Sequence, residues 1–255
     1  MIDIHCHLLP GVDDGPPDEA TAIAMCRMAA ESGTTDVVAT PHANSTFEYS
    51  PERNEEKRCQ LQQAVGPAPR IHLGCDFHLS YDNIEAALAT PSRFTINGRR
   101  YLLVEFSNQV ISEGTSDVFA RLRGAGVTPI ITHPERNPLL RRHHSRLAVW
   151  VQRGCLIQIT AGSLLGRFGS QAQDAATSLV NAHLVHIVAS DGHDLEKRPP
   201  VLAESRAFVA DRWGDDLARQ LFVGHPQAVL DGTPIDTPAP RRRSQEPRKW
   251  WEFWR

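Results

Sequence analysis

Short runs rich in Val, Ile and Thr alternate along the chain with amphipathic or alanine-rich segments, and this alternation constrains the fold more than any other feature. The runs predict seven strands, at residues 2–7, 36–40, 71–75, 101–106, 127–132, 156–160 and 184–190. The segments between them predict helices at 18–32, 52–65, 115–125, 145–153, 171–181 and 201–212. Strands separated by helices of this length form βα units with a parallel sheet. Seven such units favour a closed or nearly closed α/β barrel, with an open sheet as the alternative.

The chain is expected to fold as one domain that ends near residue 232. Its 255 residues suit a single α/β barrel, and no internal repeat or low-complexity segment interrupts the first 232. After Gly232 the composition changes to TPIDTPAPRRRSQEPRKWWEFWR, which is rich in Pro and Arg. We therefore predict a folded domain over 1–232 and a basic, Trp-rich, flexible tail over 233–255.

Side chains of the kinds that bind metal ions close six of the seven predicted strands. His5 and His7 are two residues apart on the first strand, so their imidazoles point the same way. The further candidates near strand ends are Asp14, His42, Asp76, Glu105, His133, Asp191 and His193. The carboxyl ends of parallel barrel strands open on one rim, where these side chains would meet. A single His or Asp at a strand end is usually a helix cap or a hydrogen-bonded core residue, but repetition at six strand ends indicates a metal cluster.

Five histidines and four carboxylates are too many ligands for one ion and suit two or three ions with bridging carboxylates. Cys6 alternates away from the histidine face of the first strand, so no cysteine ligand is needed. Mixed imidazole and carboxylate ligands suit Mn²⁺, Zn²⁺ or Fe²⁺. Adjacent divalent ions lower the pKa of a bridging water and hold both oxygens of an in-line displacement. The predicted chemistry is therefore hydrolysis, most naturally of a phosphate ester.

The motifs DIHCHLLPGVDDG, VVATPH, VEFS, ITHPERN and VASDGHD resemble the polymerase and histidinol phosphatase (PHP) superfamily. The combination of HxHxxPGxDDG with THPER is similar to its bacterial manganese-dependent protein-tyrosine phosphatases, which act on capsule and exopolysaccharide tyrosine kinases. The resemblance covers residues 1–232 and implies a distorted (β/α)₇ TIM-like barrel with a trinuclear metal site at the carboxyl ends of the strands. The ligands it implies are His5, His7, Asp14, His42, Asp76, Glu105, His133, Asp191 and His193. Mn²⁺ is the expected ion, with Fe²⁺, Zn²⁺ or Mg²⁺ as alternatives, and the family usually has Glu where this chain has Asp76.

The same resemblance implies arginines that hold phosphoryl oxygens beside the metal ions. Arg136 of HPERN and Arg198 of EKRPP match this role, and the planar guanidinium binds two oxygens at once. The implied reaction is attack of a metal-bridging hydroxide on the phosphorus of phosphotyrosine. The leaving phenolate has a pKa of about 10, so weak proton donation is enough, and His193 and Asp194 are the candidate general acids.

Other classes of protein can be weighed against the same residues. A cysteine-dependent phosphatase needs an arginine six residues after its nucleophile, and no cysteine of this chain has one. The residues six positions after the five cysteines are Val12, Ser32, Val65, Tyr81 and Ala161. Two alternatives stay open: a small-molecule phosphoesterase of the histidinol phosphatase type, and a non-catalytic metal-binding regulator on the same fold.

The charge distribution bears on partners and location. The net charge is −3, and residues 241–255 contribute +4, so residues 1–240 carry −7. This acidic body disfavours nucleic acid as a partner. Five scattered cysteines, no leader-like segment and no apolar run of membrane-spanning length predict a cytoplasmic protein. The expected partner is a phosphotyrosine-bearing protein, such as a bacterial tyrosine kinase.

The tail has two interpretations. Three of the five tryptophans lie in the last six residues, among basic side chains. One interpretation is a solubilising terminus. The other is that residues 241–255 contact a membrane surface or a partner protein, which would place the protein at the inner face of the membrane.

Overall fold

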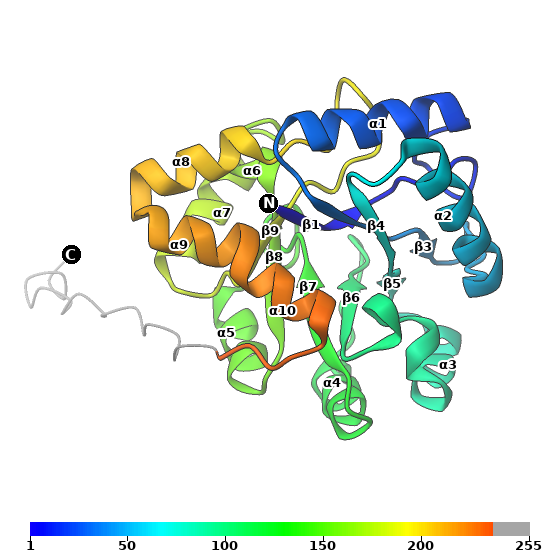
Figure 1. Cartoon of the computed structure of the whole chain (residues 1–255). Coiled ribbons are helices and arrows are strands. Elements are labelled where there is room, and N and C mark those ends of the chain that lie inside the picture. The colour runs from blue at the N-terminus through cyan, green and yellow to red at the C-terminus, as the bar shows by residue number, and fades with distance from the viewer. Residues whose placement is uncertain (237–255) are drawn as a thin grey trace, which may run out of the picture.

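Parallel strands form two sheets in the computed structural model, which describes residues 1–236 (Figure 1). The first sheet has the order β1-β2-β4, with β1 at Ile2–Cys6, β2 at Asp36–Ala39 and β4 at Arg70–Leu73. The second has the order β3-β5-β6-β7-β8-β9. Its strands are His42–Ala43, Asp76–His78, Tyr101–Glu105, Thr128–Thr132, Leu156–Thr160 and Ile187–Ala189, in that order. All strand pairs in the described part of the chain are parallel, as the βα pattern predicted.

Helices surround the strands on the outside of the molecule (Figure 1). The six predicted helices are present within two residues of their predicted ends: α1 (Glu19–Glu31), α2 (Pro51–Val65), α4 (Thr115–Gly124), α5 (His144–Gln152), α7 (Ser170–Asn181) and α8 (Ala203–Trp213). Four helices were not predicted: α3 (Tyr81–Ala89), α6 (Ala161–Leu164), α9 (Asp215–Arg219) and α10 (His225–Asp231). Three of these have seven residues or fewer, too short to give a clear helical period, and α3 buries only Ala87 among its nine residues. Short 3₁₀ turns lie at Pro91–Arg93 and Ile96–Gly98, and a π-helical turn lies at Gln220–Gly224.

Two short strands, β3 and β5, were not predicted; they follow the predicted strands at 36–40 and 71–75 after a break in the chain. Pro41 lies between β2 and β3, and Gly74 lies between β4 and β5. Proline cannot donate to a strand ladder. A Cβ at Gly74 would lie 2.9 Å from Cγ1 of Ile96, so only glycine fits there. After these breaks His42 lies directly opposite Asp76 in the β3–β5 register.

The two sheets do not form one closed ladder in the described residues. Their edges meet where β1 and β9 end, because Cys6 and Gly192 form an isolated parallel bridge. There the His7 N–H donates to the Gly192 carbonyl and the Asp191 N–H donates to the His5 carbonyl, both at 2.8 Å. The structure therefore confirms an α/β fold with parallel sheets, and the closed barrel stays a prediction.

The space between the sheets is apolar at the amino ends of the strands. Ile2, Tyr101 and Ile187 lie in this cluster, and Val229 and Leu230 of α10 pack against it. Figure 1 shows α10 crossing in front of the strands. Because this end is filled, the polar carboxyl ends are where a functional site can open.

Helix α10 is fixed at its carboxyl end. The Tyr101 hydroxyl donates to the Thr233 carbonyl at 2.6 Å, and Arg99 donates to the Asp231 carbonyl at 2.6 Å. Gly232, at φ 70°, ends the helix in the left-handed conformation. The predicted tail contact at 241–255 lies outside the described residues, and the domain boundary near 232 stays a prediction. No helix in the described part is long and apolar enough to cross a membrane.

Candidate metal centre

The structure brings all nine predicted ligands together in four overlapping groups. Within each group the ligand atoms lie within 4.8 Å of one another. The groups are His7–Asp14–His42–His193, His5–His7–Asp76, His5–His133–Asp191 and His42–Asp76–Glu105. Because four residues belong to two groups each, the site is one continuous cluster rather than separate sites.

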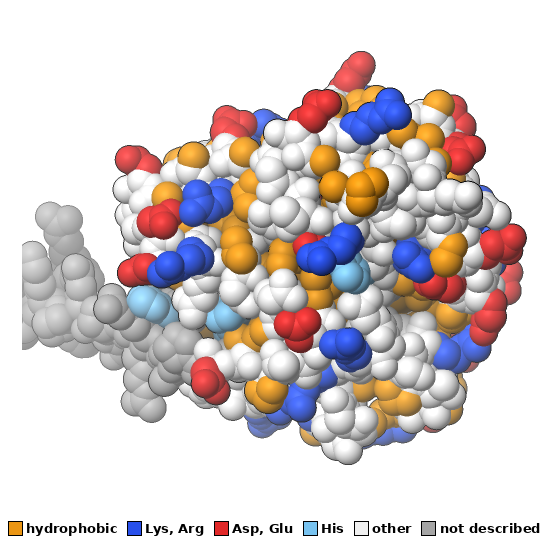
Figure 2. Space-filling model, viewed as in Figure 1, with side chains coloured by type: hydrophobic (Ala, Val, Ile, Leu, Met, Phe, Trp, Pro, Cys, Tyr) orange, Lys and Arg blue, Asp and Glu red, His pale blue; other side chains and the backbone are white. Residues whose placement is uncertain are grey.

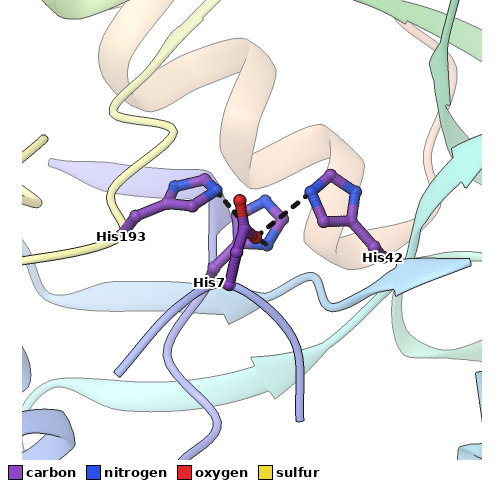
Figure 3. A group of neighbouring side chains, drawn as sticks. His7, His42 and His193 are labelled. Atoms are coloured by element: carbon purple, nitrogen blue, oxygen red, sulfur yellow. Dashed lines mark ion pairs between the residues drawn. The ribbon is translucent and has the colours of Figure 1, made fainter. Parts of the chain in front are cut away.

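The outer part of the cluster is open to solvent. Figure 3 shows the imidazoles of His7, His42 and His193 converging from separate segments of the chain. Oδ1 of Asp14 lies 3.4 Å from Nε2 of His42 and 3.3 Å from Nε2 of His193. The Asp14 side chain is 48% exposed, so a substrate can reach this group.

Asp76, in the inner part of the cluster, is buried and has no hydrogen-bond donor. The Asp76 side chain is 1% exposed, and neither of its oxygens has a hydrogen-bond partner. Its Oδ2 lies 3.3 Å from Nδ1 of His42 and 3.5 Å from Nε2 of His5. A buried carboxylate without donors is costly unless a cation compensates it. The donor set and these unpartnered oxygens therefore fit divalent cations.

Three histidines are oriented by a hydrogen bond from Nδ1. His5 Nδ1 lies 3.0 Å from Oε1 of Gln158, and His7 Nδ1 lies 2.7 Å from Oδ2 of Asp13. His193 Nδ1 lies 2.9 Å from the Asp191 carbonyl. Because these partners only accept, Nδ1 carries the proton and Nε2 keeps a free lone pair. This is the usual arrangement of metal-binding histidines.

Asp13, which was not among the residues predicted from the sequence, also contacts the cluster. Its Oδ2 accepts from His7 Nδ1 and, at 3.0 Å, from the His42 N–H, while Oδ1 accepts from the Gly15 N–H at 3.1 Å. The side chain is 1% exposed, in contrast to Asp14 beside it. A Cβ at Gly15 would lie 2.6 Å from the His7 carbonyl, so the glycine of DDG lets this loop pack on β1. The Asp-Asp-Gly motif was the available signal, but it does not say which aspartate turns inward.

Asp13→Asn is expected to weaken metal binding about 10- to 100-fold, because the amide orients His7 less strongly than a carboxylate. Titration of the metal-free protein with Mn²⁺ by calorimetry measures this. Asp18→Asn is the matched control, since Asp18 is a helix cap that accepts from the Thr21 N–H. Equal Mn²⁺ affinity in the two variants would contradict the role given to Asp13.

The charges of the cluster call for cations. Burial opposes protonation of His5, but Asp76 and Asp191 raise its pKa to about 9. Burial likewise opposes protonation of His42, but the neighbouring Asp14 and Asp76 carboxylates raise its pKa to about 11. Burial and the Asp76 charge raise the pKa of Glu105 to about 7. Without metal ions, His5, His42 and Glu105 therefore tend to hold protons beside the carboxylates. Metal ions that bind to these side chains should displace those protons into solution.

Two of the candidate ligands have a strained backbone. His133 has φ 33° and Asp191 has φ 53°, in the left-handed region that residues other than glycine seldom adopt. Such strain is concentrated at functional sites, where the surrounding structure holds it.

Arg136 and Arg198 lie side by side at the cluster, as predicted. Both guanidinium groups donate to Oδ2 of Asp191, Arg198 at 2.6 Å. The Arg136 guanidinium also lies over the Phe168 ring, 4.3 Å from its centroid. Their side chains are 23% and 25% exposed, so both can reach a bound ligand. Their role in phosphate binding stays a prediction.

The two candidate general acids are placed differently. His193 faces Asp14 through Nε2, as a ligand would. Oδ1 of Asp194 instead accepts from the backbone N–H groups of Glu196, Lys197 and Arg198. Burial alone would raise the pKa of Asp194, but these backbone donors lower it, which keeps the carboxylate charged. This geometry suits a side chain that shapes the turn carrying Arg198, and it does not favour proton donation.

The chain thus has the features of α/β proteins whose candidate metal ligands lie together at the carboxyl ends of parallel strands. It belongs to the CpsB/CapC family of capsular polysaccharide synthesis, whose model matches residues 1–231. It is 35% identical over 225 residues to the tyrosine-protein phosphatase YwqE of Bacillus subtilis, covering 87% of this chain and 88% of YwqE. It is 29% identical to the tyrosine-protein phosphatase CpsB of Streptococcus pneumoniae, covering 90% and 98%. The resemblance found in the motifs is thereby confirmed.

Solved structures agree with this family. A crystal structure from work on YwqE and CpsB, described as unique metal-dependent tyrosine phosphatases, superimposes with a TM-score of 0.87 at 33% identity. It covers 95% of this chain and 100% of the solved chain. A β-aspartyl dipeptidase of Fervidobacterium islandicum has a TM-score of 0.58 at 15% identity, which is a likeness of fold alone.

Proposed function

We propose that this protein is a metal-dependent tyrosine-protein phosphatase that acts on a bacterial tyrosine kinase controlling capsule or exopolysaccharide synthesis. The observation that carries the proposal is the convergence of nine ligands beside two partly exposed arginines. The printed names of the relatives support the substrate class. We also propose a distorted (β/α)₇ barrel, supported by the Cys6–Gly192 bridge between the two sheets.

The nine clustered residues would hold two or three divalent cations, with Mn²⁺ as the first choice. When bound, these ions activate water for attack on phosphorus and withdraw charge from the phosphoryl oxygens. Arg136 and Arg198 bind the remaining phosphoryl oxygens, which their planar forks suit. Phe168 supports the Arg136 guanidinium, and Gln158 and Asp13 keep His5 and His7 in the tautomer that leaves Nε2 free. The phenolate is a good enough leaving group to depart with little proton donation.

Chelation followed by Mn²⁺ add-back tests the proposed function. Stripped protein is expected to lose release of phosphate from a phosphotyrosine peptide, and Mn²⁺ is expected to restore it. Histidinol phosphate is assayed in parallel. Turnover of histidinol phosphate alone would replace the substrate class, and metal binding without turnover of either substrate would indicate a regulator.

A further inference from the structure

A group of basic side chains lies beyond Arg136, on the segment that joins β7 to α5 and in the first turn of α5. This basic rim patch consists of Arg141, Arg142, His143 and Arg146. No acidic residue occurs in the sequence between Glu135 and Asp174, and the first turn of α5 contains none. Within residues 1–236, no ion pair joins Arg141, Arg142 or Arg146 to a carboxylate. The patch therefore offers positive charge that the fold itself does not neutralise.

Asn137 ties the segment that carries the patch to the loop that follows Glu105. Its carbonyl accepts from the Arg141 N–H at 3.0 Å, and its Oδ1 accepts from the N–H groups of Leu139 and Leu140. Its Nδ2 donates to the Ser107 carbonyl at 3.0 Å, on the loop that follows β6. Arg141 and Arg142 follow Arg136 by only five and six residues. The patch would therefore meet substrate residues that flank the phosphotyrosine rather than the phosphotyrosine itself.

The surface of the patch is hollowed rather than flat. One hollow of about 420 Å³ is lined by Arg141, Arg142, His144 and Ser145. A second, of about 460 Å³, is lined by Ser116, His143, Ser145, Arg146, Val149 and Trp150. Ser145 borders both, so the two hollows adjoin and could each take a side chain.

Charges elsewhere on the molecule are mixed. Figure 2 shows the face that carries α8, α9 and α10, where acidic and basic side chains are interspersed. Residues 1–240 carry a net charge of −7, so a basic patch beside the metal centre runs against the overall charge. Such a local reversal of sign attracts and orients an acidic ligand.

We propose that the basic rim patch binds Asp and Glu side chains that flank the phosphotyrosine in the protein substrate. The proposal rests on the proposed phosphatase function and adds a sequence preference to it. The patch contributes to binding of the peptide and not to the chemical step, because its residues lie outside the ligand cluster. Exposed ion pairs are individually weak, so several acting together should improve peptide affinity about 3- to 10-fold.

The test compares two peptides that differ only in flanking residues. Both contain phosphonomethyl-phenylalanine in place of phosphotyrosine, so binding is measured without turnover. One has Asp and Glu three to five residues from it, and the other has Asn and Gln. The Mn²⁺-loaded protein is expected to bind the acidic peptide about 3- to 10-fold more tightly by fluorescence anisotropy at low salt. The difference should shrink as salt is added.

Two charge-reversal variants locate the effect. Arg142→Glu is expected to abolish the preference, whereas Arg153→Glu, at the opposite end of α5, should retain it. Turnover of p-nitrophenyl phosphate, which has no flanking residues, should be equal in all three proteins. An acidic preference without phosphotyrosine hydrolysis would keep the patch and refute the proposed function.

Equal affinity of the unmodified protein for the two peptides would overturn the patch proposal even if phosphotyrosine is hydrolysed. So would an equal loss of the acidic-peptide preference in Arg142→Glu and Arg153→Glu. Binding to phosphatidylserine vesicles that Arg142→Glu removes, with no peptide preference, would also overturn it and assign the patch to a lipid surface.

Discussion

Asp191→Asn is expected to lower kcat/KM for a phosphotyrosine peptide about 1000-fold. Asp191 is buried and connects the two halves of the site. Its Oδ1 lies 3.4 Å from Nε2 of His5, and its Oδ2 accepts from both Arg136 and Arg198. An amide in its place would turn an NH₂ group either toward the metal-binding atoms or toward the guanidinium groups. The substitution preserves shape, so the fold should survive.

Metal analysis and kinetics together check this expectation. Purified Asp191→Asn should retain less Mn²⁺ than the unmodified protein, by atomic emission, and should lose turnover at saturating Mn²⁺ as well. Asp211→Asn, on the exposed surface of α8, is the control for the same chemical change. Full metal content with turnover within tenfold of the unmodified protein would show that Asp191 is not central to the site.

The convergence of the candidate ligands was predictable because of one repeated property of the chain. In βα units each strand delivers its last side chains to the same rim, so residue type at strand ends is enough to list them. His5, Glu105 and Asp191 were found in this way, although they are far apart in sequence. The prediction needed no knowledge of strand order or register.

The finer geometry depends on contacts that a single sequence does not display. Asp13 and Asp14 are adjacent and identical in type, and the inward position of Asp13 is seen only in its hydrogen bonds to His7, His42 and Gly15. Gln158 lies on the one predicted strand without a ligand-type end, and its role follows from the β7–β8–β9 pairing that brings it to His5. The break at Gly74 before β5 likewise depends on packing against Ile96 and Val38.

Asp76 illustrates how such a detail affects function. The family resemblance leads one to expect Glu at this position, and aspartate is shorter by one methylene. The β3–β5 register places His42 directly opposite Asp76, and Oδ2 already lies 3.3 Å from Nδ1 of His42. The shorter side chain therefore still reaches the other ligands of this group.

Arg136→Ala is expected to lower kcat/KM about 100- to 1000-fold while Mn²⁺ content stays unchanged. Arg136 belongs to none of the four ligand groups, and Arg198 would still hold Oδ2 of Asp191 in the variant. Loss of the guanidinium removes two donors for the phosphoryl oxygens, an interaction that strengthens as charge builds up on them.

Arg136→Lys separates charge from geometry. Lysine keeps the positive charge but lacks the planar fork and the stacking on Phe168, so it should recover only part of the lost rate. Arg212→Ala, on α8, controls for removal of an arginine. If Arg136→Ala instead loses Mn²⁺ along with activity, the arginine acts by holding Asp191 for the metal ions. If Arg136→Ala retains both Mn²⁺ and activity, Arg136 does not bind the phosphoryl group. Arg198 alone would then have to compensate the charge of the phosphoryl oxygens.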